Sequence, residues 1–289
     1  MLTRNFTLIL AFLLCTLSSK AQEGTIHTDL SLKSEILKME RNYAIYLPPD
    51  YESSGKEYPV LYLLHGAGDD HTGWIEKGNM KAITDSALAE GIALPMIIVM
   101  PDAQTVQRGY FNALHGNWNY EDFFFEEFIP HVEQKYRVIG TKANRAVAGL
   151  SMGGGGSFMY AMHHPELFVA AAPLSAYVGP LSLDDFKRYN PDLLTRHSEK
   201  EIQDYYAQHN ALSLLESVSP EKLNTVGWYI DCGDDDFLYE GNSRVHILMR
   251  QKEIAHEYRV RDGAHDWNYW QTALPEVLRF VSSFFGQPD

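Results

Sequence analysis

The sequence predicts an α/β protein with a mostly parallel sheet covered by helices on both faces. Short apolar runs, typical of strands buried on both faces, alternate with segments of helical periodicity from about residue 42 onward. Strands that alternate with helices in this way form parallel sheets. The chain has 289 residues, of which 45% are hydrophobic and 21% charged, which is a globular balance and allows one sizeable core. We therefore expect a single domain over residues 22–289, large enough to hold a catalytic site.

The expected elements follow in order along the chain. Strands are expected at 42–47, where an outer strand ends at two prolines, and then at 58–64, 95–100, 145–150, 168–176, 225–232 and 256–260. Helical patterns lie between them at 80–90, 121–136, 157–163 and 242–251, and a last helix is expected at 267–285. The stretch 181–220 is polar, acidic and helix-prone, and it contains no buried-strand pattern. We expect it to be a small helical insertion above the sheet that serves as a cap, not a second domain.

Residues 1–21 have the three parts of a secretory signal peptide. Arg4 supplies a positive charge, residues 6–17 are mostly apolar, and Ser19-Lys20-Ala21 offers small residues for cleavage. The apolar run is shorter than the ~20 residues that span a membrane. Cys15 follows Leu14, whereas lipoproteins have a small residue there. We expect cleavage near Ala21 and a secreted or periplasmic protein with no integral membrane segment.

The charge and the cysteines exclude several classes of partner and site. The formal net charge is −14, and an acidic surface repels phosphate backbones, so we expect no nucleic-acid partner. Cys232 is the only cysteine outside the predicted signal, which leaves no intramolecular disulfide. The aspartate run 234–236 lacks calcium-loop spacing, and His and Cys ligands do not cluster. We therefore expect no metal and no cofactor.

The strongest motif is Gly149-Leu150-Ser151-Met152-Gly153, a G-x-S-x-G sequence between a strand pattern and a helical one. This is the context of a nucleophile elbow, a sharp turn whose glycines avoid collisions with the neighbouring strand and helix. The hydroxyl of Ser151 would then lie at the carboxyl end of the sheet. The alternative is a Gly-rich turn with a helix-capping serine. A phosphate loop is disfavoured because no Lys-Ser or Lys-Thr follows the glycines.

A serine that attacks a carbonyl needs donors for the oxyanion. His65-Gly66-Ala67-Gly68 follows the apolar strand at 58–64, and its small residues let backbone N–H groups approach a developing negative charge. We expect the N–H groups of Ala67 and Met152 to form the oxyanion hole. A simple turn that ends the strand is the alternative for His65-Gly66.

The general base is expected late in the chain, because an elbow serine precedes first the acid and then the histidine. Of twelve histidines, His265 lies on a loop just after the last expected strand. His163 and His164 end a helical pattern, where a structural role is favoured. The acid should follow the strand at 225–232, where three aspartates, 234–236, are adjacent, and spacing does not choose between them.

Four motifs resemble the esterase D group of α/β-hydrolases: GLSMGG at 149–154, LLHGAG at 63–68, CGDDDFL at 232–238 and GAHDWNYW at 263–270. The group includes feruloyl and acetylxylan esterases, S-formylglutathione hydrolases and mycolyltransferases. The resemblance covers nearly all of residues 40–286, and it implies an α/β-hydrolase fold. Its acid motif, G-x-x-D followed by a small or apolar residue and Leu, places the acid at Asp236, and its base motif supports His265. Residues 181–220 show no such match.

The resemblance implies a secreted serine carboxylesterase that hydrolyses feruloyl or acetyl esters on plant cell-wall polysaccharides such as xylan. Ser151, His265 and Asp236 would act as a triad through an acyl-enzyme. The expected partner is an acylated oligosaccharide or a small ester. The alternatives are an acyltransferase with the same triad, an S-formylglutathione-hydrolase-like thioesterase and a catalytically silent carbohydrate-binding relative. The intact triad argues against the last of these.

Three aromatic residues are expected to bind substrate, because sugars and phenolic rings stack on aromatic faces. Trp118 and Tyr120 lie on the loop before the helix that precedes the nucleophile strand, and Trp267 is two residues past the base. Trp270, one helical turn further, is expected in the core.

Overall fold

The computed structural model describes residues 23–103 and 109–287. The predicted signal peptide lies outside these residues. Within these residues, eight strands form one sheet in the order β1-β2-β4-β3-β5-β6-β7-β8, with antiparallel pairing from β1 to β4 and parallel pairing from there on. The strands are β1 (Thr25–Ser34), β2 (Met39–Leu47), β3 (Val60–Leu64), β4 (Ile97–Pro101), β5 (Arg145–Leu150), β6 (Ala170–Leu174), β7 (Gly227–Gly233) and β8 (Glu257–Arg261). The mostly parallel sheet is the one expected from the sequence.

The central strands are buried on both faces, which explains their continuous apolar sequences. In β3, Tyr62 and Leu64 pack into the hydrophobic cluster on one face, and Leu61 and Leu63 pack into the cluster on the other. Strand β1 was not expected. Its side chains alternate between exposed and half-buried positions, because it lies at the edge of the sheet with β2 as its partner.

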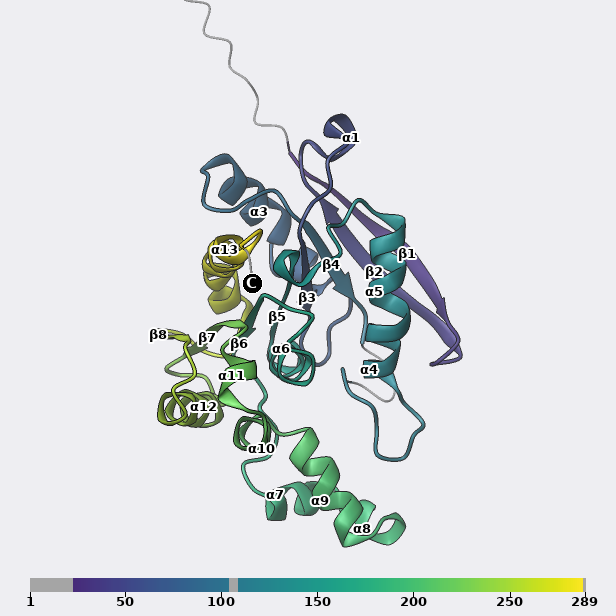
Figure 1. Ribbon diagram of the computed structural model, residues 1–289, viewed down its shortest axis with the longest axis vertical. Coiled ribbons are helices and arrows are strands. Elements are labelled where there is room, and N and C mark those ends of the chain that lie inside the picture. The colour runs from purple at the N-terminus through teal and green to yellow at the C-terminus, as the bar shows by residue number, and fades with distance from the viewer. Residues whose placement is uncertain (1–22, 104–108, 288–289) are drawn as a thin grey trace, which may run out of the picture.

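Helices cover both faces of the sheet. One face is covered by α3 (Met80–Ala89) and α13 (Trp267–Phe284), which lie side by side (Figure 1). The other is covered by α5 (Ile129–Lys135), α6 (Met152–His163) and α12 (Tyr239–Gln251). Shorter helices are α1 (Tyr51–Ser54), α2 (Gly73–Glu76) and α4 (Tyr120–Asp122), with a π-helical turn at Phe123–Phe128 between α4 and α5 and a 3₁₀ turn at Lys142–Asn144.

Two helices differ from their expected bounds. Helix α6 begins five residues before the expected start at 157, because four consecutive glycines, 153–156, conceal its periodicity in the sequence. The helix expected at 121–136 is broken into α4, the π-helical turn and α5, with Pro130 in the first turn of α5. In the part of the chain that is described, no helix is both long enough and apolar enough to cross a membrane.

The insertion expected at 181–220 is helical. It lies between β6 and β7 and contains α7 (Leu183–Tyr189), α8 (Leu193–Arg196), α9 (Glu199–Gln208) and α10 (Ala211–Ser217), and α11 (Pro220–Leu223) leads into β7. Figure 1 shows α7, α8 and α9 projecting from the lower end of the molecule, away from the sheet. Helix α10 packs against α6 and α12 and so joins the insertion to the body.

His163 ties the insertion to the body. Its Nδ1 lies 2.6 Å from Oε1 of Glu121 in α4, and its Nε2 lies 2.8 Å from the carbonyl oxygen of Gln208 at the end of α9. Both partners accept hydrogen bonds, so the ring donates to both when it is protonated. Burial disfavours the charged ring, but the hydrogen bond and charge of Glu121 outweigh burial and raise the pKa of His163.

We expect His163→Gln to lower the free energy of unfolding by about 1–3 kcal/mol in mild acid, the usual contribution of a hydrogen bond to a charged group. Because the folded-state pKa is raised, this stabilisation is complete below about pH 6.5 and is lost as the pH rises through the folded-state value. Urea unfolding at pH 5.5 and pH 8.5 measures the difference. The exposed His27→Gln is the control, and a His163→Gln deficit that grows with pH would contradict the expectation.

Candidate active site

Ser151 lies on a strained turn at the carboxyl end of the sheet. It connects β5 to α6 with φ 55° and ψ −115°, a conformation that residues other than glycine rarely adopt. Its N–H donates to the carbonyl of Leu174 at 2.9 Å, and its own carbonyl accepts from the N–H of Tyr177 at 2.9 Å. The serine backbone is therefore held by the end of β6, as a nucleophile elbow requires.

The glycines on each side of Ser151 allow the elbow to pack directly against β3. A Cβ on Gly153 would lie 2.6 Å from the carbonyl oxygen of Leu64 and 2.7 Å from that of His65. A Cβ on Gly149 would lie 2.6 Å from the carbonyl oxygen of Gly153. These contacts are with backbone atoms, so only glycine fits both positions.

Gly153→Ala should therefore destabilise the protein and displace the nucleophile. Overpacking of this kind costs about 1–3 kcal/mol, and a small shift of Ser151 reduces the rate as well. Thermal unfolding and ester hydrolysis check the two effects. Gly73→Ala is the control, since its Cβ would meet the side chain of Asp69 and not backbone. An alanine at 153 that leaves both the unfolding midpoint and the rate unchanged would contradict the packing argument.

Ser151, His265 and Asp236 form one chain of hydrogen bonds. Nε2 of His265 lies 2.9 Å from Oγ of Ser151, and Nδ1 lies 2.8 Å from Oδ2 of Asp236. The carboxylate of Asp236 is fully buried, and its Oδ1 accepts from the N–H of Leu238 at 2.8 Å. The sequence left three adjacent aspartates open, and the structure puts Asp236 against the imidazole while Asp234 and Asp235 are exposed.

The surroundings of Asp236 keep it ionised. Burial raises its pKa, but hydrogen bonds from His265, Leu238 and Ser175 together outweigh burial and lower the pKa below its ordinary value. The ionised carboxylate of Asp236 can only accept a hydrogen bond, so Nδ1 of His265 carries the ring proton and donates to it. Nε2 of His265 then has a lone pair that can accept a proton. His265 is thus oriented to take a proton from Ser151.

Sequence reasoning missed Ser175. It lies directly after β6, is fully buried, and has a positive φ of 43°. Its hydroxyl contributes to lowering the pKa of Asp236, and its Oγ accepts from Nε1 of Trp270 at 3.0 Å. The ring of Trp270 stands perpendicular to the imidazole of His265, with centroids 5.0 Å apart. Trp270 is buried as expected, and it contacts both His265 and Ser175. The one sequence signal for Ser175 was its place at the carboxyl end of a strand.

The loop that carries the expected oxyanion donors lies beside the nucleophile. A Cβ on Gly66 would be 3.5 Å from the Cβ of Ser151, which places Ala67 next to the elbow. Met152 is the first residue of α6, where N–H groups have no acceptor within the helix. The N–H groups of Ala67 and Met152 remain our prediction for the oxyanion hole.

The neutral imidazole of His65 holds this loop through two hydrogen bonds. Its Nδ1 lies 2.8 Å from the carbonyl oxygen of Gly66, so Nδ1 donates, and its Nε2 accepts from the N–H of Ala103 at 3.0 Å. Burial lowers the pKa of His65, in agreement with this single-proton arrangement. His65 is therefore a structural part of the loop.

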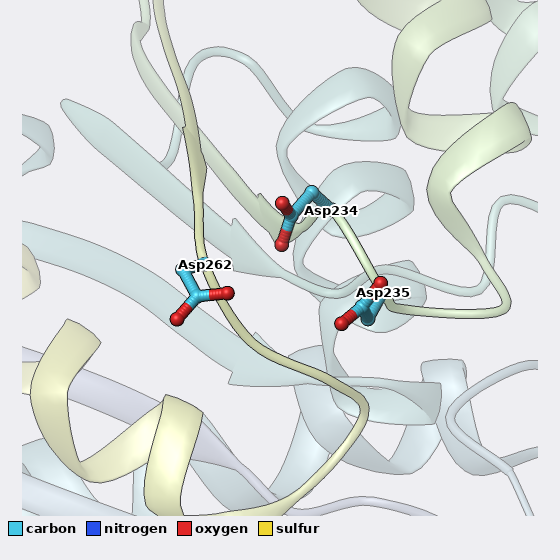
Figure 2. A group of neighbouring side chains, drawn as sticks. All are labelled: Asp234, Asp235 and Asp262. Carbon is cyan, nitrogen blue, oxygen red and sulfur yellow. The ribbon is translucent and has the colours of Figure 1, made fainter.

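Three exposed carboxylates lie together at the ends of β7 and β8 (Figure 2). Asp234 and Asp235 follow β7, Asp262 follows β8, and their oxygens lie within 4.8 Å of one another. Backbone hydrogen bonds also join the two loops: Asp234 donates to the carbonyl of Arg261, Asp235 donates to that of Gly263, and Oδ1 of Asp234 accepts from the Gly263 N–H. We infer that these hydrogen bonds fix the loop that carries Asp236 relative to the loop that carries His265.

Two of the three aromatic residues expected to bind substrate are buried instead. Tyr120 is fully buried and donates to the carbonyl of Asp102, and Trp118 is 4% exposed and donates to the carbonyl of Gly109. Neither ring offers a face to a ligand, so the prediction for them is wrong. Trp267 is half-buried and packs edge-on against Trp74 and Trp270, and its contact with substrate remains a prediction.

Solved structures that resemble this chain include esterases and related hydrolases. A ferulic acid esterase is 38% identical, with a TM-score of 0.80 over 91% of this chain and 100% of that one. An S-formylglutathione hydrolase from Staphylococcus aureus shares the fold at 20% identity, with a TM-score of 0.71 over 89% of this chain and 99% of that one.

Sequence comparisons agree. An endo-1,4-beta-xylanase/feruloyl esterase from Xylanibacter ruminicola is 36% identical over 131 residues, 43% of this chain and 18% of that protein. The chain spans less than a third of the length of this and two other curated relatives. The family model described as "Putative esterase" matches residues 34–281. Because that match covers most of the chain, the protein belongs to this esterase family and has its α/β-hydrolase fold.

Proposed function

We propose that the protein is a serine carboxylesterase that removes feruloyl or acetyl groups from plant cell-wall polysaccharides such as xylan. The observation that carries the proposal is the continuous hydrogen-bond chain from Asp236 through His265 to Ser151. A serine, a histidine and a buried acid in this order form a nucleophile, a base and an orienting group.

In the first half of the reaction, Oγ of Ser151 attacks the ester carbonyl while Nε2 of His265 takes the hydroxyl proton. The carbonyl oxygen becomes an oxyanion, which the N–H groups of Ala67 and Met152 stabilise. Each such donor is worth roughly 3–4 kcal/mol in related chemistry. His265 then gives its proton to the alcohol oxygen, the ester C–O bond breaks, and the acyl group remains on Ser151.

In the second half, a water molecule enters and His265 takes one of its protons. The hydroxide attacks the acyl-enzyme, the acid is released, and His265 returns the proton to Oγ of Ser151. Asp236 stays ionised throughout and stabilises the imidazolium. An acyltransferase would follow the same first half and would admit an acceptor alcohol in place of water.

The substrate class rests on similarity. The ferulic acid esterase at 38% identity covers nearly the whole chain, and the Xylanibacter ruminicola relative joins a xylanase to a feruloyl esterase. A polymeric glycan lies outside the cell, which fits the export signal expected at residues 1–21.

A panel of esters tests the proposal. The purified chain is assayed with acetylated and feruloylated xylo-oligosaccharides, methyl ferulate, 4-nitrophenyl palmitate and S-formylglutathione. We expect the highest kcat/KM on the acetyl or feruloyl esters, with free acid as the product. Preference for palmitate with untouched xylo-oligosaccharides would overturn the substrate class and leave an esterase. Transfer to an added alcohol without release of acid would identify an acyltransferase, and hydrolysis of S-formylglutathione alone would identify a thioesterase.

A further inference from the structure

Exposed aromatic side chains gather around a small cavity beside the triad. The cavity has a volume of about 230 Å³, and its lining includes Tyr177 after β6, Tyr189 at the end of α7, and Phe237 directly after the catalytic acid. Their exposed fractions are 45%, 67% and 71%. Single exposed aromatic rings are common, but several that gather around one cavity form an apolar patch of the kind found at ligand-binding surfaces.

Two lining residues contact the triad directly. The ring of Phe237 lies against the imidazole of His265, with centroids 4.4 Å apart. The backbone N–H of Tyr177 donates to the carbonyl of Ser151 at 2.9 Å. The cavity therefore adjoins the residues of the triad.

The position of His265 decides which half of an ester enters this cavity. His265 donates the proton that releases the alcohol, so the alcohol oxygen must lie within hydrogen-bond reach of Nε2. The rest of the alcohol then extends past the imidazole. Because Phe237 covers one side of that ring, the aromatic cavity adjoins the path of the leaving group.

The polar groups of the cavity suit a ligand with hydroxyl groups. Asp185 of α7 and Glu240 of α12 both line it. Asp185 is paired with Arg188 and Glu240 with Arg244, at 2.8 Å and 2.7 Å. A carboxylate has about four acceptor sites, so each pair keeps acceptors for a hydroxyl proton. Apolar ring faces beside hydroxyl acceptors match a sugar, which has C–H faces and O–H edges.

We infer that the cavity between Tyr177, Tyr189 and Phe237 is a glycosyl subsite that binds the sugar bearing the ester, with Tyr189 of the insertion as its outer stacking platform. The assignment rests on the proposed esterase function, and it gives the insertion at 181–220 a role in substrate recognition. The volume is below the ~300–1,000 Å³ of pockets for drug-sized ligands, so it takes a single ring. Its exposed rim leaves room for a polymer to continue into solvent.

The test separates the sugar from the acyl group. Tyr189→Ala, Tyr177→Ala and the double variant are assayed on acetylated xylo-oligosaccharide, which has the sugar alone, and on methyl ferulate, which has the aryl acid alone. 4-Nitrophenyl acetate, which has neither, is the reference. We expect each single variant to lower kcat/KM on the sugar ester about 3- to 10-fold more than on the other two esters, mainly through KM, because a stacked ring is worth that much.

The control is Leu194→Ala in α8. Leu194 is exposed, belongs to the same insertion, and is not among the residues that line the cavity. It should leave all three rates unchanged. If the Tyr variants lower methyl ferulate hydrolysis selectively, the cavity holds the acyl ring and the assignment is wrong. Equal losses on all three esters also overturn it, while the esterase stands. A wild-type chain that cleaves no ester overturns the proposed function and this assignment with it.

Discussion

Ser151→Ala should lower kcat/KM for ester hydrolysis by about 10⁴-fold or more, because members of a triad act as a unit. The expectation follows from the bond of 2.9 Å between Oγ of Ser151 and Nε2 of His265. Steady-state hydrolysis of 4-nitrophenyl acetate by the purified variant measures the loss. Activity within 100-fold of the wild type would show that another residue is the nucleophile.

The same position provides a test of backbone strain. Ser151 has φ 55° and ψ −115°, which glycine adopts without steric cost and serine or alanine do not. Ser151→Gly should therefore be equally inactive yet unfold at a higher denaturant concentration than Ser151→Ala, with a difference of about 1 kcal/mol. Equal midpoints would mean that the turn is not strained.

Asp236→Asn should lower kcat by about 10⁴-fold, because it favours the tautomer of His265 that does not accept a proton at Nε2. The N–H of Leu238 donates to Oδ1, so an asparagine keeps its carbonyl oxygen there and turns its NH₂ toward Nδ1 of His265. Nδ1 must then accept a hydrogen bond, which puts the ring proton on Nε2. The histidine is then unable to accept the proton of Ser151.

Asp234→Asn and Asp235→Asn are the matched controls, since both side chains are exposed and neighbour the acid. An asparagine at 234 still has an oxygen to accept from the N–H of Gly263. Both variants should keep kcat within about threefold of the wild type, as surface substitutions do. Similar losses in all three variants would place the acid elsewhere.

Local sequence patterns were sufficient for most of the sheet and for the turn at Ser151, whereas the choice of Asp236 among three adjacent aspartates came from the resemblance to a family. Buried strands such as β5 show as apolar runs, and the elbow shows as a fixed spacing of small residues around Ser151. Strand β1 was missed because it has few apolar residues, and a register shift between His27 and Leu30 puts Ile26 against one hydrophobic cluster and Leu30 and Leu32 against the other.

Long-range contacts account for what the sequence did not predict. Trp118 stands between two asparagines, which suggested an exposed loop, but hydrogen bonding to Gly109 and packing on Tyr120 bury it. Conversely, Phe237, for which the sequence analysis made no prediction, is 71% exposed and its ring lies against His265. Neither outcome depends on neighbours in the sequence, because burial is decided by segments that meet only in the folded chain.

The insertion leaves the body after β6 and returns at β7, two strands that pair directly in the sheet. Its connection to the body runs through α10 and His163, and Ser151, Asp236 and His265 all lie in other segments of the chain. On the proposed assignment, only Tyr189 of the three aromatic lining residues belongs to the insertion, whereas Tyr177 and Phe237 lie in the body beside Ser151 and Asp236. Under the same assignment, exchange of α7 to α9 would change the outer wall of this subsite and leave Ser151, Asp236 and His265 in place, so an engineer could vary the sugar contacts without altering those three residues.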